Sequence, residues 1–521
     1  MSVAVDKVAG MARIAVIGAG MGAMAAAARL AVAGHRVTVY ERTETYGGAV
    51  RRFERDGFRF DTGPGLLTLP AVYRDLFVKT GKEPLEDCVE LVQVDPSARH
   101  VFADGTEVSL PNASRAGVVA ALDEALGAGA GERWGDFLVR AREAWDRTRR
   151  PLLEEPLWPN WQVLAGKEPY PGTTYKRLLG RRRVVTLFEI GRRELRDPRL
   201  AQLLDGYALA YGVDPGTAPA SAAVLPYMEH AFGTWYVRGG IRELADAVYE
   251  RCRKRRVEFV FGAEVTRILE KDGRAAGVEL AGGTSRASGS GGGTVAEADF
   301  VVGQGPWRLR DLTDRQVYGA GAVEPEPEDR YPGRVVVCLA LRGAREPGAV
   351  HRTLVHAADD EGDLDLLRHG ELPDLPTTVV DRPDDPALRP DGEHESVVLT
   401  ATVPSATEYD WAAPGAADAF ADRMLAAAER AVPGLRKRVL WREVRTPLDT
   451  ERETGAVGGA VPPPALAAPE GVLHPANSTA VPGLFAVGGW SHPGGGLPHA
   501  GMSGALVAGL IVEGPEFRGS Q

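Results

Sequence analysis

The pattern of apolar positions near the N-terminus predicts a strand, a helix and a second strand in immediate succession. Residues 14–17 form a short uninterrupted apolar run, which is typical of a strand buried in a parallel sheet. Residues 23–33 are mostly small residues with good helix propensity, and Gly34 ends the predicted helix. Residues 36–40 predict the second strand, which ends at Glu41. This order is that of a βαβ unit.

Small residues between the first strand and the helix have the spacing of a dinucleotide-binding turn. Gly18 permits the tight turn, Gly20 lets backbone approach a pyrophosphate, and Ala23 lets the helix lie close to the strand. The free N–H groups at the helix N-terminus favour phosphate. Glu41 follows at the distance where a carboxylate accepts hydrogen bonds from ribose hydroxyls. The unit therefore predicts a dinucleotide site.

A transmembrane helix is the alternative interpretation of residues 14–33, which are nearly all apolar or small. The glycines of this window and the charge of Arg29 argue against it. Elsewhere no uninterrupted apolar run reaches the roughly 18 residues that a spanning helix needs.

The rest of the pattern predicts a long chain of mixed helices and strands, and its length favours two domains. Helices are expected at residues 119–126, 134–149, 196–215 and 241–254, and from Leu497 onward. Strands are expected at residues 257–261, 265–269, 275–280, 295–302, 335–341, 353–356, 397–403 and 484–487. The Gly-rich run 282–293 predicts a flexible hairpin tip, and the Pro- and Trp-rich segment 151–175 predicts irregular structure.

Composition narrows the class of protein. A net charge of −10 argues against general nucleic-acid binding. Cys88, Cys252 and Cys338 are far apart, so no disulfide framework, thiol redox pair or zinc site is expected. Residues 1–10 are too short and too polar for a signal peptide, and Met11 is a second candidate start. We expect a cytoplasmic protein, with peripheral contact at the inner face of the membrane as an open option.

One local charge feature stands out against this acidic background. Eight basic residues gather between residues 176 and 196, and they are Lys176, Arg177, Arg181, Arg182, Arg183, Arg192, Arg193 and Arg196. They indicate either a solvated helix face or a surface for an anionic partner, which would be a lipid headgroup layer or an acidic carrier protein.

Two further glycine-rich segments complete the set of motifs. Gly47 and Gly48 form a turn just past Glu41, and the run Asp61-Thr62-Gly63-Pro64 returns the chain towards the nucleotide. Near the C-terminus a strand at 484–487 leads into Gly488-Gly489, a His-Pro-Gly-Gly-Gly loop and a helix that starts at Leu497 and Pro498.

Taken together, these segments resemble phytoene-desaturase-like FAD oxidoreductases, in the flavoprotein superfamily of amine oxidases and GDP-dissociation inhibitors. The resemblance runs from Ile14 to Ile511. One position departs from it: in that family an arginine follows the second glycine pair and helps neutralise the pyrophosphate, and here Ala49 stands there. Arg51 and Arg52 follow closely, and a nearby guanidinium could take that role.

The resemblance implies the fold class and domains. It implies an α/β protein, with a Rossmann-like FAD-binding domain assembled from the discontinuous segments 11–85, 235–310 and 455–521. An inserted α+β substrate-binding domain would comprise residues 86–234 and 311–454.

The resemblance also implies the cofactor contacts. One tightly bound FAD is expected, and no second dinucleotide domain. The implied contacts are Gly18, Gly20, Met21, Gly22, Ala23, Glu41, Arg42, Gly47, Gly48, Ala49, Val50, Gly63, Pro64, Val265, Gly488, Gly489, Gly496, Leu497 and Pro498. Val265 would present its backbone to the adenine, and the helix N-terminus near Pro498 would favour negative charge on the reduced flavin ring.

The implied reaction is desaturation of an extended apolar isoprenoid or carotenoid-type chain, with hydride transfer to flavin N5 and reoxidation by oxygen or a quinone. An alternative keeps the fold and changes the substrate to another polyene, such as a polyketide chain on a carrier protein, which is dehydrogenated or isomerised. A third hypothesis is a non-catalytic prenyl-binding protein, which predicts degraded nucleotide motifs, whereas Gly18, Gly20 and Glu41 are intact.

No nucleophilic or paired-carboxylate catalytic system is evident in the sequence, which fits chemistry carried by a cofactor. His351 and His356 fall where the family carries histidine, yet each alone is more often an ordinary structural histidine. His492 and His499 lack a carboxylate or Cys at ligand spacing, so we expect no metal. Catalytic residues stay unassigned.

Overall fold

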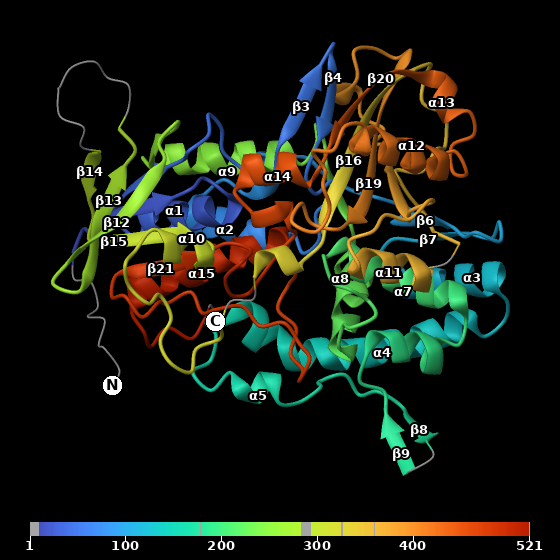
Figure 1. Ribbon diagram of the computed structural model, residues 1–521, viewed down its shortest axis with the longest axis horizontal. Helices are drawn as coiled ribbons and strands as arrows, with labels where there is room; N and C mark the ends of the chain where they lie inside the picture. The colour runs from blue at the N-terminus through green and yellow to red at the C-terminus, as the bar shows by residue number, and fades with distance from the viewer. Residues whose placement is uncertain (1–9, 178–179, 283–292, 325–326, 359, 520–521) are drawn as a thin grey trace.

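The computed structural model describes residues 10–177, 180–282, 293–324, 327–358 and 360–519. The polar start of the chain and most of the predicted hairpin tip at 282–293 lie outside the described residues. Figure 1 shows two regions side by side: a sheet with covering helices that holds both ends of the described chain, and a second sheet beside it.

The first region is built on a five-stranded sheet in which every neighbouring pair is parallel. In sheet order its strands are β11 (Glu258–Val260), β2 (Arg36–Tyr40), β1 (Arg13–Ile17), β15 (Phe300–Gln304) and β21 (Leu484–Val487). Strand β1 is central and buried on both faces, because Ile14 and Val16 pack in one cluster and Ala15 in another. Burial on both faces explains why its sequence is continuously apolar.

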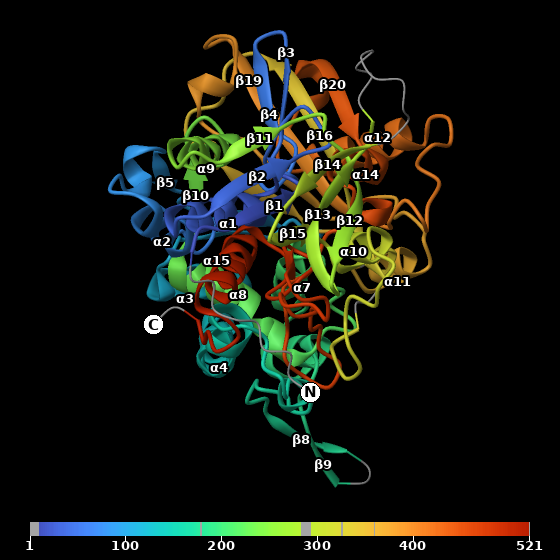
Figure 2. The same cartoon turned by 90° about the vertical axis from the view of Figure 1, so that its left-hand side faces the viewer.

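Helices α1 (Met21–Val32), α15 (Leu497–Glu513), α2 (Ala71–Thr80) and α9 (Arg242–Lys254) cover one face of this parallel sheet. Helix α1 packs against α15, with α2 and α9 beside them (Figures 1 and 2). A Cβ atom at Gly504 would clash with the carbonyl oxygen of Gly22, so glycine permits the close α1–α15 contact. The predicted strand–helix–strand order and both helices are confirmed.

The other face is covered by α10 (Pro306–Asp311) and a three-stranded sheet of β12 (Val265–Lys271), β13 (Arg274–Leu280) and β14 (Thr294–Glu297). The prediction of one strand over 295–302 is wrong, because β14 and β15 are separate strands in different sheets. The break lies at Ala298 and Asp299, whose N–H groups donate to the carbonyls of Ala276 (3.0 Å) and Arg13 (2.8 Å), so the chain crosses from one sheet to the other there.

The second region is built on a seven-stranded mixed sheet. In sheet order its strands are β20 (Val439–Arg445), β16 (Gly333–Arg342), β19 (His394–Val403), β18 (Thr378–Asp381), β17 (Arg352–Val355), β6 (Ala98–Val101) and β7 (Glu107–Leu110). Helix α12 (Ala416–Ala428) covers one face through Phe420 and Met424. The hairpin of β3 (Arg52–Arg55) and β4 (Phe58–Asp61) packs on the other through Phe58 and Phe60, against Val336 and Cys338. The predicted strands at 335–341, 353–356 and 397–403 are confirmed.

A helical layer lies below both sheets in Figure 1 and has its own apolar core around Trp134 and Phe137. Helix α7 (Pro198–Ala210) begins as predicted, since the Asp197 side chain accepts from the Arg199 N–H at 2.9 Å and Pro198 stands in the first turn. The remaining helices and small strands are α3 (Arg115–Leu126), α4 (Ala130–Arg149), α5 (Gln162–Ala165), α6 (Leu187–Glu189), α8 (Val224–Phe232), α11 (Asp360–Arg368), α13 (Leu435–Arg438), α14 (Pro447–Thr454), β5 (Leu91–Gln93) and β10 (Trp235–Val237).

The basic stretch forms an antiparallel hairpin, which projects from the helical layer in both Figure 1 and Figure 2. Its strands are β8 (Thr174–Arg177) and β9 (Gly180–Arg183), so the interpretation as a helix face is wrong for this part. Only Arg192 and Arg193 lie on a helical turn, the π-helical segment Ile190–Leu195. Within the described residues, no helix is both long enough and apolar enough to cross a bilayer.

Candidate functional site

The turn after β1 places Glu41 where the sequence predicts it. Gly18 has a φ of 87°, and its N–H donates to the carbonyl of Tyr40 at 2.7 Å, which joins the ends of β1 and β2. The Ala19 N–H donates to Glu41 Oε2 at 2.8 Å. Glu41 Oε1 accepts from the N–H and the hydroxyl of Thr43, both at 2.8 Å. The carboxylate is thus fixed beside the turn, and its two oxygens retain lone pairs for a further donor.

The second glycine pair packs directly on this turn. The Gly47 N–H donates to the Ala19 carbonyl at 2.8 Å, and both Gly47 and Gly48 have positive φ, at 101° and 62°. A Cβ atom at Gly48 would lie 3.1 Å from Gly20 Cα. Only glycine suits this backbone and this separation without strain.

The segment around Gly63 and Pro64 follows the same turn on its outer side. A Cβ atom at Gly63 would clash with the carbonyl oxygen of Ala49, so the two backbones lie against each other. Val50, between them, is buried, and its N–H donates to the Gly47 carbonyl at 3.1 Å. The structure therefore brings together the predicted contacts of residues 47–50 and 63–64.

Glycines also let the Gln304 side chain lie close to the turn in front of α1. A Cβ atom at Gly18 would lie 2.8 Å from Gln304 Nε2, and one at Gly20 would lie 2.7 Å from it. Gly20 is the N-cap of α1, and Met21, Gly22 and Ala23 form its first turn, whose N–H groups have no acceptor within the helix. This cradle of backbone N–H groups, at the positive end of a helix dipole, fits the pyrophosphate of a dinucleotide.

The C-terminal motif reaches the same place from the far end of the chain. A Cβ atom at Gly22 would lie 3.3 Å from Gly488 Cα and 2.8 Å from the Ala500 carbonyl oxygen. Ser503 Oγ accepts from the Gly488 N–H at 3.0 Å and from Asn477 Nδ2 at 3.1 Å. These contacts hold the start of α15 against the start of α1.

The other predicted C-terminal contacts lie in the loop that leads into α15. A Cβ atom at Gly489 would lie 2.7 Å from Pro462 Cγ. Gly496, the N-cap of α15, has a φ of 103°, and Leu497 and Pro498 begin the helix. Tyr73 donates to the Leu497 carbonyl at 2.9 Å, which fixes the helix start.

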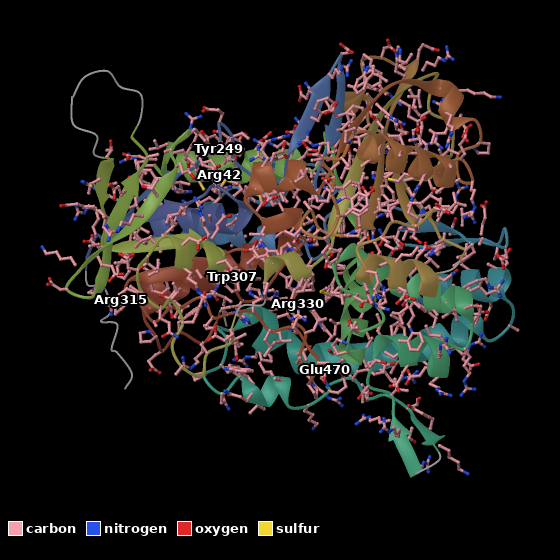
Figure 3. All side chains as sticks on the ribbon, in the orientation of Figure 1. Arg42, Tyr249, Trp307, Arg315, Arg330 and Glu470 are labelled. Carbon is pink, nitrogen blue, oxygen red and sulfur yellow. The ribbon has the colours of Figure 1, made fainter. Side chains whose placement is uncertain are left out.

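Two predicted contacts lie close in sequence or in space to Glu41. Val265 is buried as the first residue of β12, two residues after Ala263, whose N–H donates to the Glu41 carbonyl at 2.9 Å. Arg42, labelled in Figure 3, is exposed and donates to the Arg452 carbonyl at 2.7 Å at the end of α14. Its guanidinium therefore contacts α14, whereas the Glu41 carboxylate contacts the fingerprint turn.

Of the two arginines after Ala49, one stays near the turn and one points away. Arg51 donates to the Gly48 carbonyl at 3.0 Å and to the Thr43 hydroxyl at 3.3 Å. Arg52 donates to the Gly239 carbonyl and to the side chain of Glu243, in the first turn of α9.

Sequence reasoning missed Arg242 and Gln304. Arg242 donates to the carbonyls of Tyr46 and Val50 at 2.7 and 3.1 Å, so it supports the Gly47–Gly48 turn from behind. An arginine in the first turn of an ordinary amphipathic helix gives no signal of this role. Gln304, between Gly303 and Gly305 at the end of β15, could have been found from its position at a strand end of a parallel sheet.

The C-terminal histidines are buried. His492 hydrogen-bonds the Glu155 carbonyl at 2.9 Å through Nε2, and burial lowers its pKa to about 4. Burial lowers the pKa of His499 to about 3. In the part of the chain that the structure describes, no group of three or more His, Cys, Asp or Glu side chains is arranged to hold a metal ion.

A cavity of about 110 Å³ adjoins the Gly63–Pro64 segment. It lies between α7 and α11 on one side and strands β16 to β19 on the other. Leu209, Leu354 and Leu364 line one part of it, and Arg334, Arg352 and Asp381 line another. Burial and the neighbouring Arg352 lower the pKa of Arg334 to about 10, and burial raises the pKa of Asp381.

His356 also lines this cavity, and the structure shows what holds it. Its Nε2 lies 3.0 Å from His100 Nδ1, and its ring stacks on Phe102 with centroids 4.7 Å apart. Burial lowers its pKa to about 3. His351 packs against Tyr236 instead, with ring centroids 4.8 Å apart.

A second, narrower pocket of about 20 Å³ touches the start of α15. Its lining is mainly apolar, with Trp145, Leu152, Val224 and Met228 around His499. Cavities of opposite character therefore lie near two of the predicted cofactor motifs, one partly charged and one apolar.

Comparison with known proteins identifies a family of flavin-containing enzymes, which agrees with the geometry of a dinucleotide site. The profile of the family described as "Flavin containing amine oxidoreductase" matches residues 24–512. The chain is 29% identical over 509 residues to a 4,4'-diapolycopene oxygenase of Methylomonas sp, covering 96% of this chain and 98% of the relative. It is 30% identical over 505 residues to a zeta-carotene-forming phytoene desaturase of Myxococcus xanthus, covering 95% and 93%.

A solved structure shares the fold. An oxidoreductase from Methanosarcina mazei superposes with a TM-score of 0.62 at 18% identity, covering 95% of this chain and 99% of that one. The predicted fold class, an α/β protein with a discontinuous nucleotide-binding domain, is confirmed.

Proposed function

Because the chain belongs to the flavin-containing amine oxidoreductases, we propose that it is an FAD-dependent enzyme that desaturates an extended isoprenoid chain of the carotenoid type. The observation that carries this proposal is the convergence of three separated motifs on one cradle. Gly18–Ala23, Gly47–Gly48 and Gly488 pack against one another, and Glu41 stands at the edge.

These residues would hold the cofactor in a definite order along the site. Glu41 would accept from the ribose, the start of α1 would face the pyrophosphate, and the Gly488–Pro498 segment would lie against the ring. Arg51 would take the role of the arginine that other family members carry where this chain has Ala49, since the Arg51 guanidinium already donates to the Gly48 carbonyl. Residues 11–85, 235–310 and 455–521 would form this domain, and residues 86–234 and 311–454 the substrate domain.

When bound, the flavin supplies the hydride acceptor for desaturation, at its N5 atom. The protein's own part is to bind the chain, to orient it and to exclude water. The cavity beside Gly63 and the apolar pocket at His499 are suited to this, because both adjoin the segments that would lie near the ring. The final electron acceptor would be oxygen or a quinone.

The basic hairpin would dock the enzyme on an anionic lipid surface, from which an apolar substrate is drawn. Among the described residues, Arg181, Arg182 and Arg183 form no ion pair with a carboxylate. Val185 and Phe188, just beyond the hairpin, are 45% and 39% exposed. Basic and apolar groups together are typical of a membrane-surface contact, whereas an acidic carrier protein needs only the charge.

The proposal is tested by incubating the purified yellow protein with phytoene in liposomes and, separately, with a polyenoyl carrier protein. We expect phytoene to gain conjugated double bonds, seen as new visible absorbance and as mass losses in steps of two hydrogens. Oxygen added to a terminal carbon of a preformed polyene would point instead to the chemistry that the Methylomonas relative is named for. Reaction of the carrier substrate alone would support the alternative polyene. A colourless protein without flavin would contradict the proposal and favour a non-catalytic prenyl-binding protein.

A further inference from the structure

We propose that the cavity between α7, α11 and the mixed sheet binds a hydroxyl-bearing end group of the isoprenoid chain. The inference rests on the proposed function and narrows its substrate class. A pure hydrocarbon would need only an apolar tunnel, and this cavity is lined in part by charged side chains.

The charged part of the wall is built by the register of two neighbouring strands. Arg352 in β17 pairs directly with Asp381 in β18, so both side chains emerge on the same face of the sheet. Arg352 Nε lies 3.6 Å from Asp381 Oδ1, which is too long for a hydrogen bond. Arg334 approaches from β16 on the same wall.

These groups lack the hydrogen bonds that buried polar groups normally make. In the described part of the chain, the Arg352 guanidinium donates to no protein acceptor, and the Asp381 carboxylate accepts from no protein donor. Among the described residues, Arg334 donates to the Ala210 carbonyl alone. If a hydrocarbon displaced water from this wall, Arg352 and Asp381 would stay without hydrogen bonds, and binding would be penalised.

The mixture of donors and acceptor selects among possible end groups. A hydroxyl can accept from Arg352 or Arg334 and donate to Asp381 at the same time. A carboxylate would face Asp381, and an ammonium group would face both arginines, so each meets a like charge. A neutral hydroxyl is the end group that satisfies the wall without repulsion.

The cavity also fixes where the rest of the chain must run. At about 110 Å³ it has room for an end group and not for a whole carotenoid chain. A Cβ atom at Gly65 would lie 3.5 Å from Asp381 Oδ2, so the polar wall begins where the Gly63–Gly65 segment ends. The chain would leave the cavity past this segment, with Leu209, Leu354 and Val379 against its first carbons.

Competition between two matched ligands tests the proposal. FAD-loaded protein is mixed with liposomes that contain equal amounts of phytoene and its terminal-hydroxyl derivative, re-isolated, and analysed by mass spectrometry for the ratio of retained ligands. We expect the hydroxylated chain to be retained at least about tenfold more, because a site built for a hydroxyl rejects the analogue that lacks it.

A double variant removes the Arg352–Asp381 pair from the wall without leaving either charge of the pair alone. Arg352→Leu together with Asp381→Leu should bring the ratio to one or below, because both partners become apolar. Asp381→Asn, which keeps the side-chain shape, should lower the ratio in part and covers the case in which the double variant does not fold. Arg442→Leu with Asp418→Leu breaks an ion pair (2.8 Å) between strand β20 of the same sheet and helix α12, and it should leave the ratio unchanged.

The outcomes separate this inference from the proposed function. If phytoene is retained equally well and is desaturated, the function stands and the hydroxyl site is wrong. A preference that persists in the folded double variant also overturns the hydroxyl site. If neither ligand is retained, both proposals fall.

Discussion

The cofactor cradle and the substrate cavity differ in how far the protein satisfies its own polar groups. At the cradle, the Glu41 carboxylate already accepts three hydrogen bonds, from Ala19 and Thr43, and glycine backbones pack on one another. At the cavity, Arg352 and Asp381 face each other at 3.6 Å without a hydrogen bond. The cradle is preorganised for a ligand with fixed geometry, whereas the cavity wall needs the ligand to supply its missing partners.

The largest expected effect is on flavin binding at the cofactor cradle. Gly20→Val should abolish flavin binding while the protein still folds. Valine tolerates the backbone of Gly20, whose φ is −71°. A Cβ atom there would lie 2.7 Å from Gln304 Nε2, the end of a flexible side chain that can move, so the fold can adapt. The valine side chain would then occupy the space that the cofactor needs. Flavin absorbance per protein, with circular dichroism as the fold check, measures this. Gly392→Val, where a Cβ meets nothing within 4 Å, is the matched control. A fully yellow Gly20→Val protein would refute the assignment of the cradle.

The second largest expected effect is on membrane binding through the basic hairpin of β8 and β9. Changing Arg181, Arg182 and Arg183 to Glu should weaken binding to anionic liposomes by roughly 3 kcal/mol or more, at about 1 kcal/mol for each lost cation. Liposome flotation measures it, with neutral liposomes for comparison. The same change at Arg253, Lys254 and Arg256, at the C-terminal end of α9, is the control. Equal flotation of both variants would mean that the hairpin is merely solvated, and loss of carrier-protein binding alone would identify a protein partner.

Glu41→Ala should weaken FAD binding by roughly 1–3 kcal/mol, the range for hydrogen bonds to a charged group. Isothermal titration of the stripped protein with FAD gives the affinity. Glu41→Gln, which keeps one acceptor oxygen, should fall between wild type and alanine. An alanine variant with wild-type affinity would show that the ribose does not lie here.

The smallest expected effect is a pH dependence at the junction of the two regions. Asp61 accepts from the Ile241 N–H at 2.8 Å, between Arg52 and Glu243, and burial raises its pKa to about 6. An unfolded Asp titrates near pH 4, at about 3.9. The folded state therefore binds more protons between these values, so stability should fall as pH rises from about 4 to about 6 and then level off. Melting temperatures of wild type and Asp61→Asn across this range should converge at low pH and differ above it. Parallel curves would contradict the raised pKa.

The sequence predicts the cradle well because each of its parts is local. A short apolar strand, a glycine turn and a terminal Glu41 are adjacent in the chain, and their geometry follows from backbone rules. The motif at Gly488 is also local, and only its packing on Gly22 needed the structure. The break at Ala298 escaped prediction because no Gly or Pro separates the two strands, and the change of sheet shows only in their hydrogen-bond partners.

The cavity could not be predicted because it depends on register. Nothing in the sequence pairs Arg352 with Asp381, which lie 29 residues apart and meet only because β17 and β18 run antiparallel at that offset. The hairpin was missed for a related reason: a run of arginines has no period that separates a strand from a helix. Arg242 likewise acts on the cradle through tertiary packing alone.

The most direct test of the account is a single turnover without an electron acceptor. FAD-loaded protein is mixed anaerobically with liposomes that contain phytoene or its terminal-hydroxyl derivative, and the flavin absorbance is followed while products are extracted. The account predicts that the yellow absorbance bleaches and that one new double bond forms for each flavin reduced. Flavin that stays oxidised with both substrates, in protein that retains them, would contradict it.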